Sequence, residues 1–186
     1  MKTLLAIVMT MLPLLAFCQP ERFALIVCAK SGEQSIYEEN KAVCERTKAA
    51  LLKSGFKPES VKTFAEWTQQ SPSADAVCAQ LDALKGTLGK NDQLWLFVYG
   101  EANMNQRGLS IATTGKRLRA IQLASLLDAI PARQFVFFMT RQSVGAMEPL
   151  RSKPRLVLTA TSLRVKIWGI TTSGNSPMRF ARWRGP

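Results

Sequence analysis

The hydrophobic positions of this chain gather into short apolar runs that alternate with amphipathic segments. The first run, residues 23–29, reads FALIVCA and is apolar throughout, which is typical of a strand buried on both faces of a sheet. Comparable runs predict four further strands, at residues 61–65, 93–99, 134–139 and 155–159.

Three segments between these runs have the mixed three- and four-residue spacing of amphipathic helices, at residues 38–53, 73–84 and 121–130. The first ends at Ser54-Gly55, Ser73 caps the second, and Pro131 stops the third. Strands separated by single helices predict an α/β protein. We expect a three-layer sandwich, with a mostly parallel central sheet and helices on both faces.

The amino-terminal residues have the pattern of an export signal, because Lys2 precedes an apolar stretch that ends near the small residue Cys18. The stretch is shorter than the roughly 20 apolar residues that span a bilayer. We therefore expect residues 1–18 to be a signal peptide and the mature protein to be periplasmic or secreted, with no transmembrane segment. A lipoprotein anchored at Cys18 is the minor alternative, because Phe17 stands where such sites prefer Gly, Ala or Ser.

The length of the chain, 186 residues, suits one domain with a proper core. We expect that domain to cover residues 19–160. Residues 161–186 form an irregular basic tail, either the truncated end of the domain or a cover for an open sheet edge.

The number and spacing of the cysteines and the lack of histidine exclude several kinds of site. Removal of residues 1–18 leaves Cys28, Cys44 and Cys78, an odd number that cannot all pair within one chain. The chain has no histidine, and its cysteines have no CxxC spacing, so we expect no zinc site, no other cofactor and no disulfide framework. All three cysteines are expected to be small buried core residues, and their pairing stays open.

The positive charge is unevenly distributed. Residues 19–99 hold ten Lys and Arg against ten Asp and Glu, whereas residues 100–186 hold fourteen against three. We expect a cationic binding surface at a sheet edge, formed by Lys116, Arg117, Arg119 and Arg141. Such a field attracts an acidic protein, an acidic polysaccharide or an anionic lipid surface. Nucleic acid is a weaker alternative because aromatic residues are sparse in this half, and a basic surface that serves only solubility is another.

Two strand ends carry the motifs that suggest a family. After the third expected strand the chain reads Tyr99-Gly100-Glu101, and after the fourth it reads TRQSVG from Thr140 to Gly145. With the runs FALIVCAKSGE, PSADAV, DQLWLFVYG and PRLVLTATS, these ends resemble the caspase and legumain group of cysteine peptidases over about residues 23–160. In that group the third strand ends in Gly-His, and the fourth ends in a Cys followed by a small polar residue. The resemblance implies a caspase-like sandwich.

The chain departs from this group at both catalytic positions. The histidine position falls on Glu101, and the cysteine position falls on Arg141, or on Gln142 if Gly145 is taken as the anchor. A thiol peptidase needs a thiolate and a base that shuttles its proton. The resemblance therefore implies an inactive pseudopeptidase that works as a binding or scaffold module.

Several alternatives stay open. Glu101 and Arg141 could form an ion pair that closes the cleft, or they could be two solvent-facing residues that never meet. The chain could be a hydrolase with a non-standard nucleophile at the same strand ends, namely Ser143, Thr140 or Cys28. It could also be a decayed peptidase homologue without a maintained function. The sequence leaves the oligomeric state open.

Overall fold

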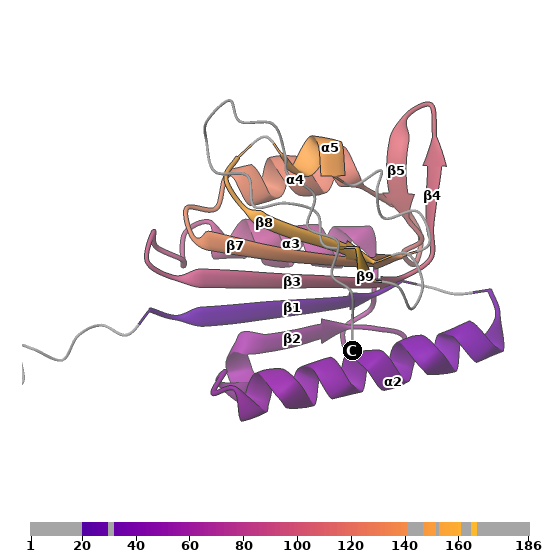
Figure 1. The fold of residues 1–186 in the computed structure, drawn as a ribbon, viewed down its shortest axis with the longest axis horizontal. Coiled ribbons are helices and arrows are strands. Elements are labelled where there is room, and N and C mark those ends of the chain that lie inside the picture. Colours follow the sequence, from indigo (N-terminus) through magenta and orange to yellow (C-terminus); the bar gives the residue numbers. More distant parts are fainter. Residues whose placement is uncertain (1–19, 30–31, 141–146, 152, 161–164, 167–186) are drawn as a thin grey trace, which may run out of the picture.

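The computed structural model describes residues 20–29, 32–140, 147–151, 153–160 and 165–166. The expected signal peptide lies outside these residues, and so does most of the expected tail. The described part is an α/β protein with helices on both faces of a mostly parallel sheet, as the alternation of strands and helices predicted (Figure 1).

The central sheet has six strands in the order β2-β1-β3-β7-β8-β9. The strands are β1 (Arg22–Cys28), β2 (Val61–Phe64), β3 (Gln93–Gly100), β7 (Arg133–Thr140), β8 (Leu156–Ala160) and β9 (Val165–Lys166). The first five in that order run parallel, and β9 pairs antiparallel with β8. Every strand predicted from the apolar runs is present, with bounds that differ by one or two residues.

The helices lie where the amphipathic segments predicted them. They are α2 (Gln34–Lys53), α3 (Ala74–Leu84) and α4 (Ala120–Asp128). Two short elements were not predicted, namely the 3-10 turn η2 (Pro58–Ser60) after α2 and the helix α5 (Met147–Leu150) after β7. Ser73 caps α3 as predicted, because its hydroxyl accepts a 3.1 Å hydrogen bond from the Ala76 amide. Helix α2 starts at Gln34, one turn before the predicted start.

The sheet separates two hydrophobic layers. The larger layer lies between the sheet and α3, α4 and α5, and it includes Leu81, Leu123 and Phe138. The smaller layer lies under α2 and joins Ile26, Cys44 and the partly covered aromatic side chains of β3 and β7. Residues 24–28 of β1 are buried throughout, because this strand has a packed layer on each side.

A second, three-stranded antiparallel sheet stands at the end where β3 finishes (Figure 1). It consists of β4 (Ala102–Asn105), β5 (Gly108–Ile111) and β6 (Leu118–Arg119), and no apolar run had predicted it. Arg119 follows Gly115 in the segment that was expected to be a loop leading to the helix at residues 121–130, and this expectation was wrong. Arg119 lies in β6, opposite Ser110, because the chain folds back along the hairpin before α4 begins.

Candidate functional site

The carboxyl ends of β1, β3 and β7 meet at one edge of the sheet, as expected for parallel strands. Gly100 lies opposite Thr140 on the neighbouring strand, and Cys28 lies opposite Tyr99. The two strand ends singled out in the sequence are therefore adjacent in space.

Gly100 makes the closest backbone approach at this edge. Its φ is +108°, and a Cβ atom there would lie 2.6 Å from the carbonyl oxygen of Ala29. The Ala29 amide in turn donates a 2.7 Å hydrogen bond to the carbonyl of Tyr99. Only glycine lets β3 turn away from the end of β1 at this point.

Glu101 follows directly and belongs to the link between the two sheets. Its carbonyl accepts a 2.9 Å hydrogen bond from the amide of Ala112, and its carboxylate oxygen Oε1 lies 3.3 Å from the donating amide of Gly32. Glu101 thus holds the segment after β1 against the segment after β3. Arg141 lies outside the described residues, and its expected ion pair with Glu101 remains a hypothesis.

The other residues considered as nucleophiles are placed as follows. Thr140 is 3% exposed, and its hydroxyl has no hydrogen-bond partner in the described part. Cys28 is buried on the side of the sheet that faces α2. Gln142 and Ser143 lie outside the described residues.

A polar cluster lies beside Cys28 under α2. The hydroxyls of Tyr99 and Thr47 share a 2.7 Å hydrogen bond, and burial raises the pKa of Tyr99 to about 12. The predicted burial of cysteine is confirmed for Cys28 and Cys44, whereas Cys78 is only partly buried.

Of the cationic residues predicted to bind a ligand, Arg119 lies in β6, Lys116 and Arg117 lie in the segment just before it, and Arg141 lies outside the described residues. Antiparallel pairing puts Asn103, Ser110 and Arg119 opposite one another, in one row across β4, β5 and β6. Paired residues of a sheet point to the same face. The Ser110 hydroxyl lies 3.4 Å from the Asn103 carbonyl, to which it donates.

Arg117 extends this row. With the Asn103 amide turned so that its oxygen faces Arg117, an orientation assigned from the surrounding donors and acceptors, the oxygen accepts hydrogen bonds of 2.8 and 3.2 Å from two guanidinium nitrogens. Arg117 and Arg119 are exposed, as are Lys116 and the hairpin residue Arg107. We call the set Asn103, Ser110, Arg117 and Arg119 the cationic face.

Strand β4 is an outer strand of the small sheet, since the described part gives it β5 as its strand partner. Residues 103–105 of this strand are exposed, and Met104 is 53% exposed. The signal that could have revealed the hairpin is Gly108, which follows the turn with a φ of +89°.

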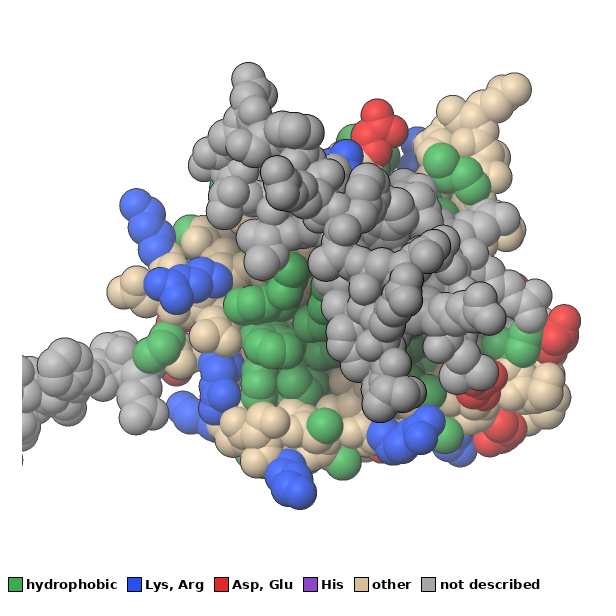
Figure 2. All heavy atoms as spheres, in the orientation of Figure 1, with side chains coloured by type: hydrophobic (Ala, Val, Ile, Leu, Met, Phe, Trp, Pro, Cys, Tyr) green, Lys and Arg blue, Asp and Glu red, His purple; other side chains and the backbone are tan. Residues whose placement is uncertain are grey.

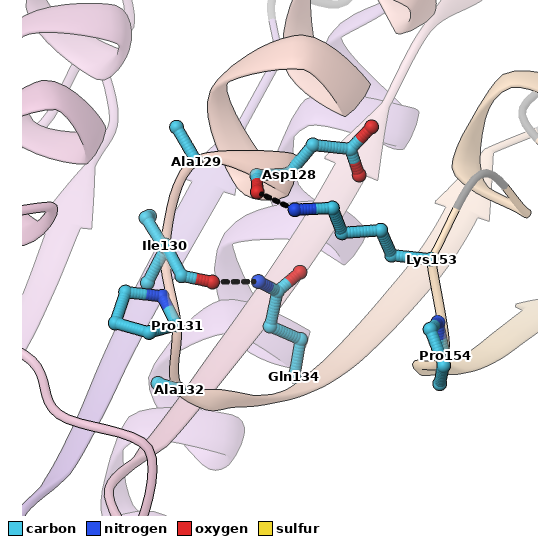
Figure 3. A pocket seen from close by; sticks show the side chains of 8 residues that line it. All are labelled: Asp128, Ala129, Ile130, Pro131, Ala132, Gln134, Lys153 and Pro154. Atoms are coloured by element: carbon cyan, nitrogen blue, oxygen red, sulfur yellow. Dashed lines mark hydrogen bonds between the residues drawn. The ribbon is translucent and has the colours of Figure 1, made fainter.

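A cavity of about 310 Å³ lies at the opposite edge, between the end of α4 and the starts of β7 and β8 (Figure 3). The Gln134 amide nitrogen donates to the carbonyls of Leu127 and Ile130, at 2.6 and 2.9 Å, and Lys153 donates to the carbonyl of Asp128. These groups satisfy the last carbonyls of the helix. We therefore assign the polar residues that line this cavity to capping the end of α4 rather than to catalysis.

Asp128 forms an ion pair with Arg155, whose side chain is 1% exposed. This pair ties α4 to the segment before β8. Within the described ranges, no three Cys, Asp or Glu side chains gather where they could hold a metal ion. No helix in this part is long and apolar enough to cross a membrane.

Comparison with known proteins supports the fold alone. No family model matches the chain, and no curated protein matches it. The structure is similar to that of protein GSU0716 from Geobacter sulfurreducens, with a TM-score of 0.51 and 18% sequence identity. The match covers 71% of this chain and 62% of that one.

Replacement of Gly100 by alanine should destabilise the fold more than the same replacement at Gly115. The added methyl meets backbone at Ala29 in addition to the strain of a positive φ, so Gly100→Ala should lower the free energy of unfolding by about 2–5 kcal/mol. Gly115→Ala is the matched control, because Gly115 has a φ of +78° and no atom within 4 Å of the added Cβ. It should cost about 1–2 kcal/mol in urea unfolding. Equal decreases in the free energy of unfolding for the two variants would show that the close approach of Gly100 to Ala29 does not add to the destabilisation.

Proposed function

We propose that this chain is an exported, catalytically inactive relative of the caspase-like peptidases that binds an acidic polypeptide segment through the cationic face. The observation that carries the binding proposal is the row of Asn103, Ser110 and Arg119, which Arg117 extends. The proposal of inactivity is supported by the complete absence of histidine and by Glu101 at the strand end where the resemblance expects an imidazole.

The geometry of the cationic face suits an extended acidic peptide. Such a peptide could lie on this face across the three strands, because residues 103–105, Arg117 and Arg119 are exposed. In an extended strand alternate side chains share a face. Acidic side chains on the side of the peptide that faces the sheet could then approach Arg117 and Arg119, and a guanidinium matches a carboxylate in shape and charge.

The binding proposal predicts salt-dependent affinity for a short labelled peptide of alternating Glu and Thr. Fluorescence anisotropy should show that Arg117→Gln with Arg119→Gln weakens binding roughly tenfold or more, since a hydrogen bond to a charged group contributes about 1.5–3 kcal/mol. Binding of the unaltered chain should weaken as salt is raised, because salt screens exposed charges.

The control removes the same charge from another part of the surface. Lys57→Gln with Lys90→Gln changes two exposed lysines far from β4 in the sequence, and it should leave the affinity nearly unchanged. Equal losses in the two double variants would show that net charge alone attracts the peptide. Binding of anionic vesicles or an acidic polysaccharide in preference to the peptide would also overturn the proposal.

The second candidate function is hydrolysis by a non-standard nucleophile. Thr140 favours it, because its hydroxyl lies at the strand-end edge without a hydrogen-bond partner in the described part. A hydroxyl nucleophile needs an adjacent base and a group that orients this base. Glu101 could be this base, because it follows Gly100, which lies opposite Thr140. Its carboxylate oxygen already accepts a hydrogen bond from the Gly32 amide, however.

Broad probes for serine and cysteine nucleophiles separate the two functions. We expect no adduct that forms on the native protein and is absent from the heat-denatured control. A native-only adduct on Cys28, Thr140 or Ser143, located by mass spectrometry, would establish a reactive nucleophile and contradict the proposed inactivity.

A further inference from the structure

Two cysteines from different elements meet in the layer under α2. Cys28 is the last residue of β1, Cys44 lies in the middle of α2, and both belong to the same buried cluster. Cys44 is fully buried, and Cys28 is 3% exposed. The adjacent Cys28 thiol and burial together raise the pKa of Cys44 well above its usual range.

Cys78 is excluded from this pair by the sheet. It lies in α3, whose residues pack on the opposite layer, and its sulfur accepts a 3.3 Å hydrogen bond from the side-chain amide of Gln122. The odd cysteine is thereby identified as Cys78, a choice that the sequence left open.

We propose that Cys28 and Cys44 form a disulfide when the chain folds in an oxidising compartment. The two thiols give up two protons and two electrons, and a disulfide of the thiol–disulfide oxidoreductase or glutathione class accepts them and is reduced to two thiols. The bond joins the end of β1 to α2 and closes the loop over residues 28–44.

The burial of both sulfurs determines when the bond forms. Exchange requires a thiolate, and the folded protein disfavours the Cys44 thiolate and shields both sulfurs from an oxidant. The disulfide therefore forms during folding, before α2 covers the end of β1. Once buried, it resists reduction for the same reason.

The test refolds the chain without its expected signal peptide, so that Cys18 is absent, in a glutathione redox buffer, blocks free thiols and digests without reductant. Trypsin should release residues 23–30 joined to residues 42–46, while Cys78 carries the blocking group. Because the bond restricts the unfolded chain, reductant applied during refolding should lower the melting temperature by roughly 5–10 °C.

Cys78→Ala is the matched control, and it should keep the joined peptide and the response to reductant. A blocking group on both Cys28 and Cys44 after oxidative refolding would overturn the proposal, as would a bond from either to Cys78. This test uses the unsubstituted chain as its main sample, so a variant that fails to fold leaves the result readable.

A separate observation concerns the face of the central sheet on which α2 packs, in the part that is formed by β3, β7 and β8. The parallel register aligns Trp95 with Phe135 and Phe137 with Leu158, so these side chains share one face of β3, β7 and β8. The rings of Trp95 and Phe135 stack at 4.8 Å, and those of Phe97 and Phe137 stack at 4.5 Å. Figure 2 shows hydrophobic side chains gathered in the middle of this side of the molecule.

Helix α2 packs on β1, β2 and β3, and the described part places no helix on β7 and β8 from this side. Trp95, Phe135, Phe137, Leu156 and Leu158 accordingly remain partly exposed. A contiguous aromatic surface of this kind marks an interaction site.

We further infer that residues 167–186 of this chain cover the aromatic surface of β3, β7 and β8. Strand β9 brings the chain to the outer edge of β8, with Lys166 opposite Thr159, and these residues follow directly. An extended chain advances about 3.3 Å per residue, and strands lie about 4.8 Å apart, so the segment can reach β3. The segment also has the composition to bury itself there, since it contains Trp168, Ile170 and Phe180 and no acidic residue.

Photocrosslinking of the full chain tests this inference. With p-benzoylphenylalanine in place of Phe135, irradiation should join this position to residues 167–186 of the same molecule, which mass spectrometry locates. The same replacement at Ile121 is the control, because Ile121 is 59% exposed on α4 at the opposite layer. Crosslinks between two molecules would identify a second copy as the occupant, and the absence of a crosslink from position 135 to the segment would equally overturn the inference.

Discussion

The central constraint on this structure is that a parallel sheet must be covered on both faces. Its crossovers place helices over the sheet, and each strand buries side chains above and below. Strands β1 and β3 meet this requirement, with α2 on one side and α3 and α4 on the other. Strands β7 and β8 have a helical cover on one side in the described part, which concentrates partly exposed aromatic side chains there. The core is therefore complete around β1 and β3, whereas β7 and β8 leave a partly exposed surface on the side of α2.

The elements that depend on this constraint could be predicted from the sequence. A strand buried on both faces must be apolar at every position, and residues 23–29 and 93–99 show this plainly. A helix that covers a sheet must have an apolar stripe, and a capping residue such as Ser73 fixes its start. Gly100 was located correctly beside the neighbouring strand end, since parallel strands bring their carboxyl ends to one edge.

The small sheet could not be predicted, because its strands obey other constraints. The two-residue turn between β4 and β5 is Gln106-Arg107, which lacks the Asn-Gly or Asp-Gly signature of a tight hairpin. Strand β4 alternates apolar and polar residues over only four positions, and two of the four are Asn, a residue type that is depleted in strands. The cationic residues were therefore recognised as a group, but the row that joins Arg119 to Ser110 and Asn103 needed the structure.

The asymmetry of charge acquires a physical meaning from this arrangement. The first half of the chain, which balances its charges, supplies β1, β2, α2 and α3, whereas the basic half supplies the small sheet and the far side of the central sheet. Part of the excess charge is structural, since Arg155 is buried in its ion pair with Asp128 and Lys153 caps α4. Arg117 and Arg119 are different, because they remain exposed while the Asn103 amide holds Arg117 in place. A fixed, exposed guanidinium loses less conformational entropy on binding than a free one. This property distinguishes the cationic face from the remaining positive surface and is the physical reason why we propose an acidic partner for it.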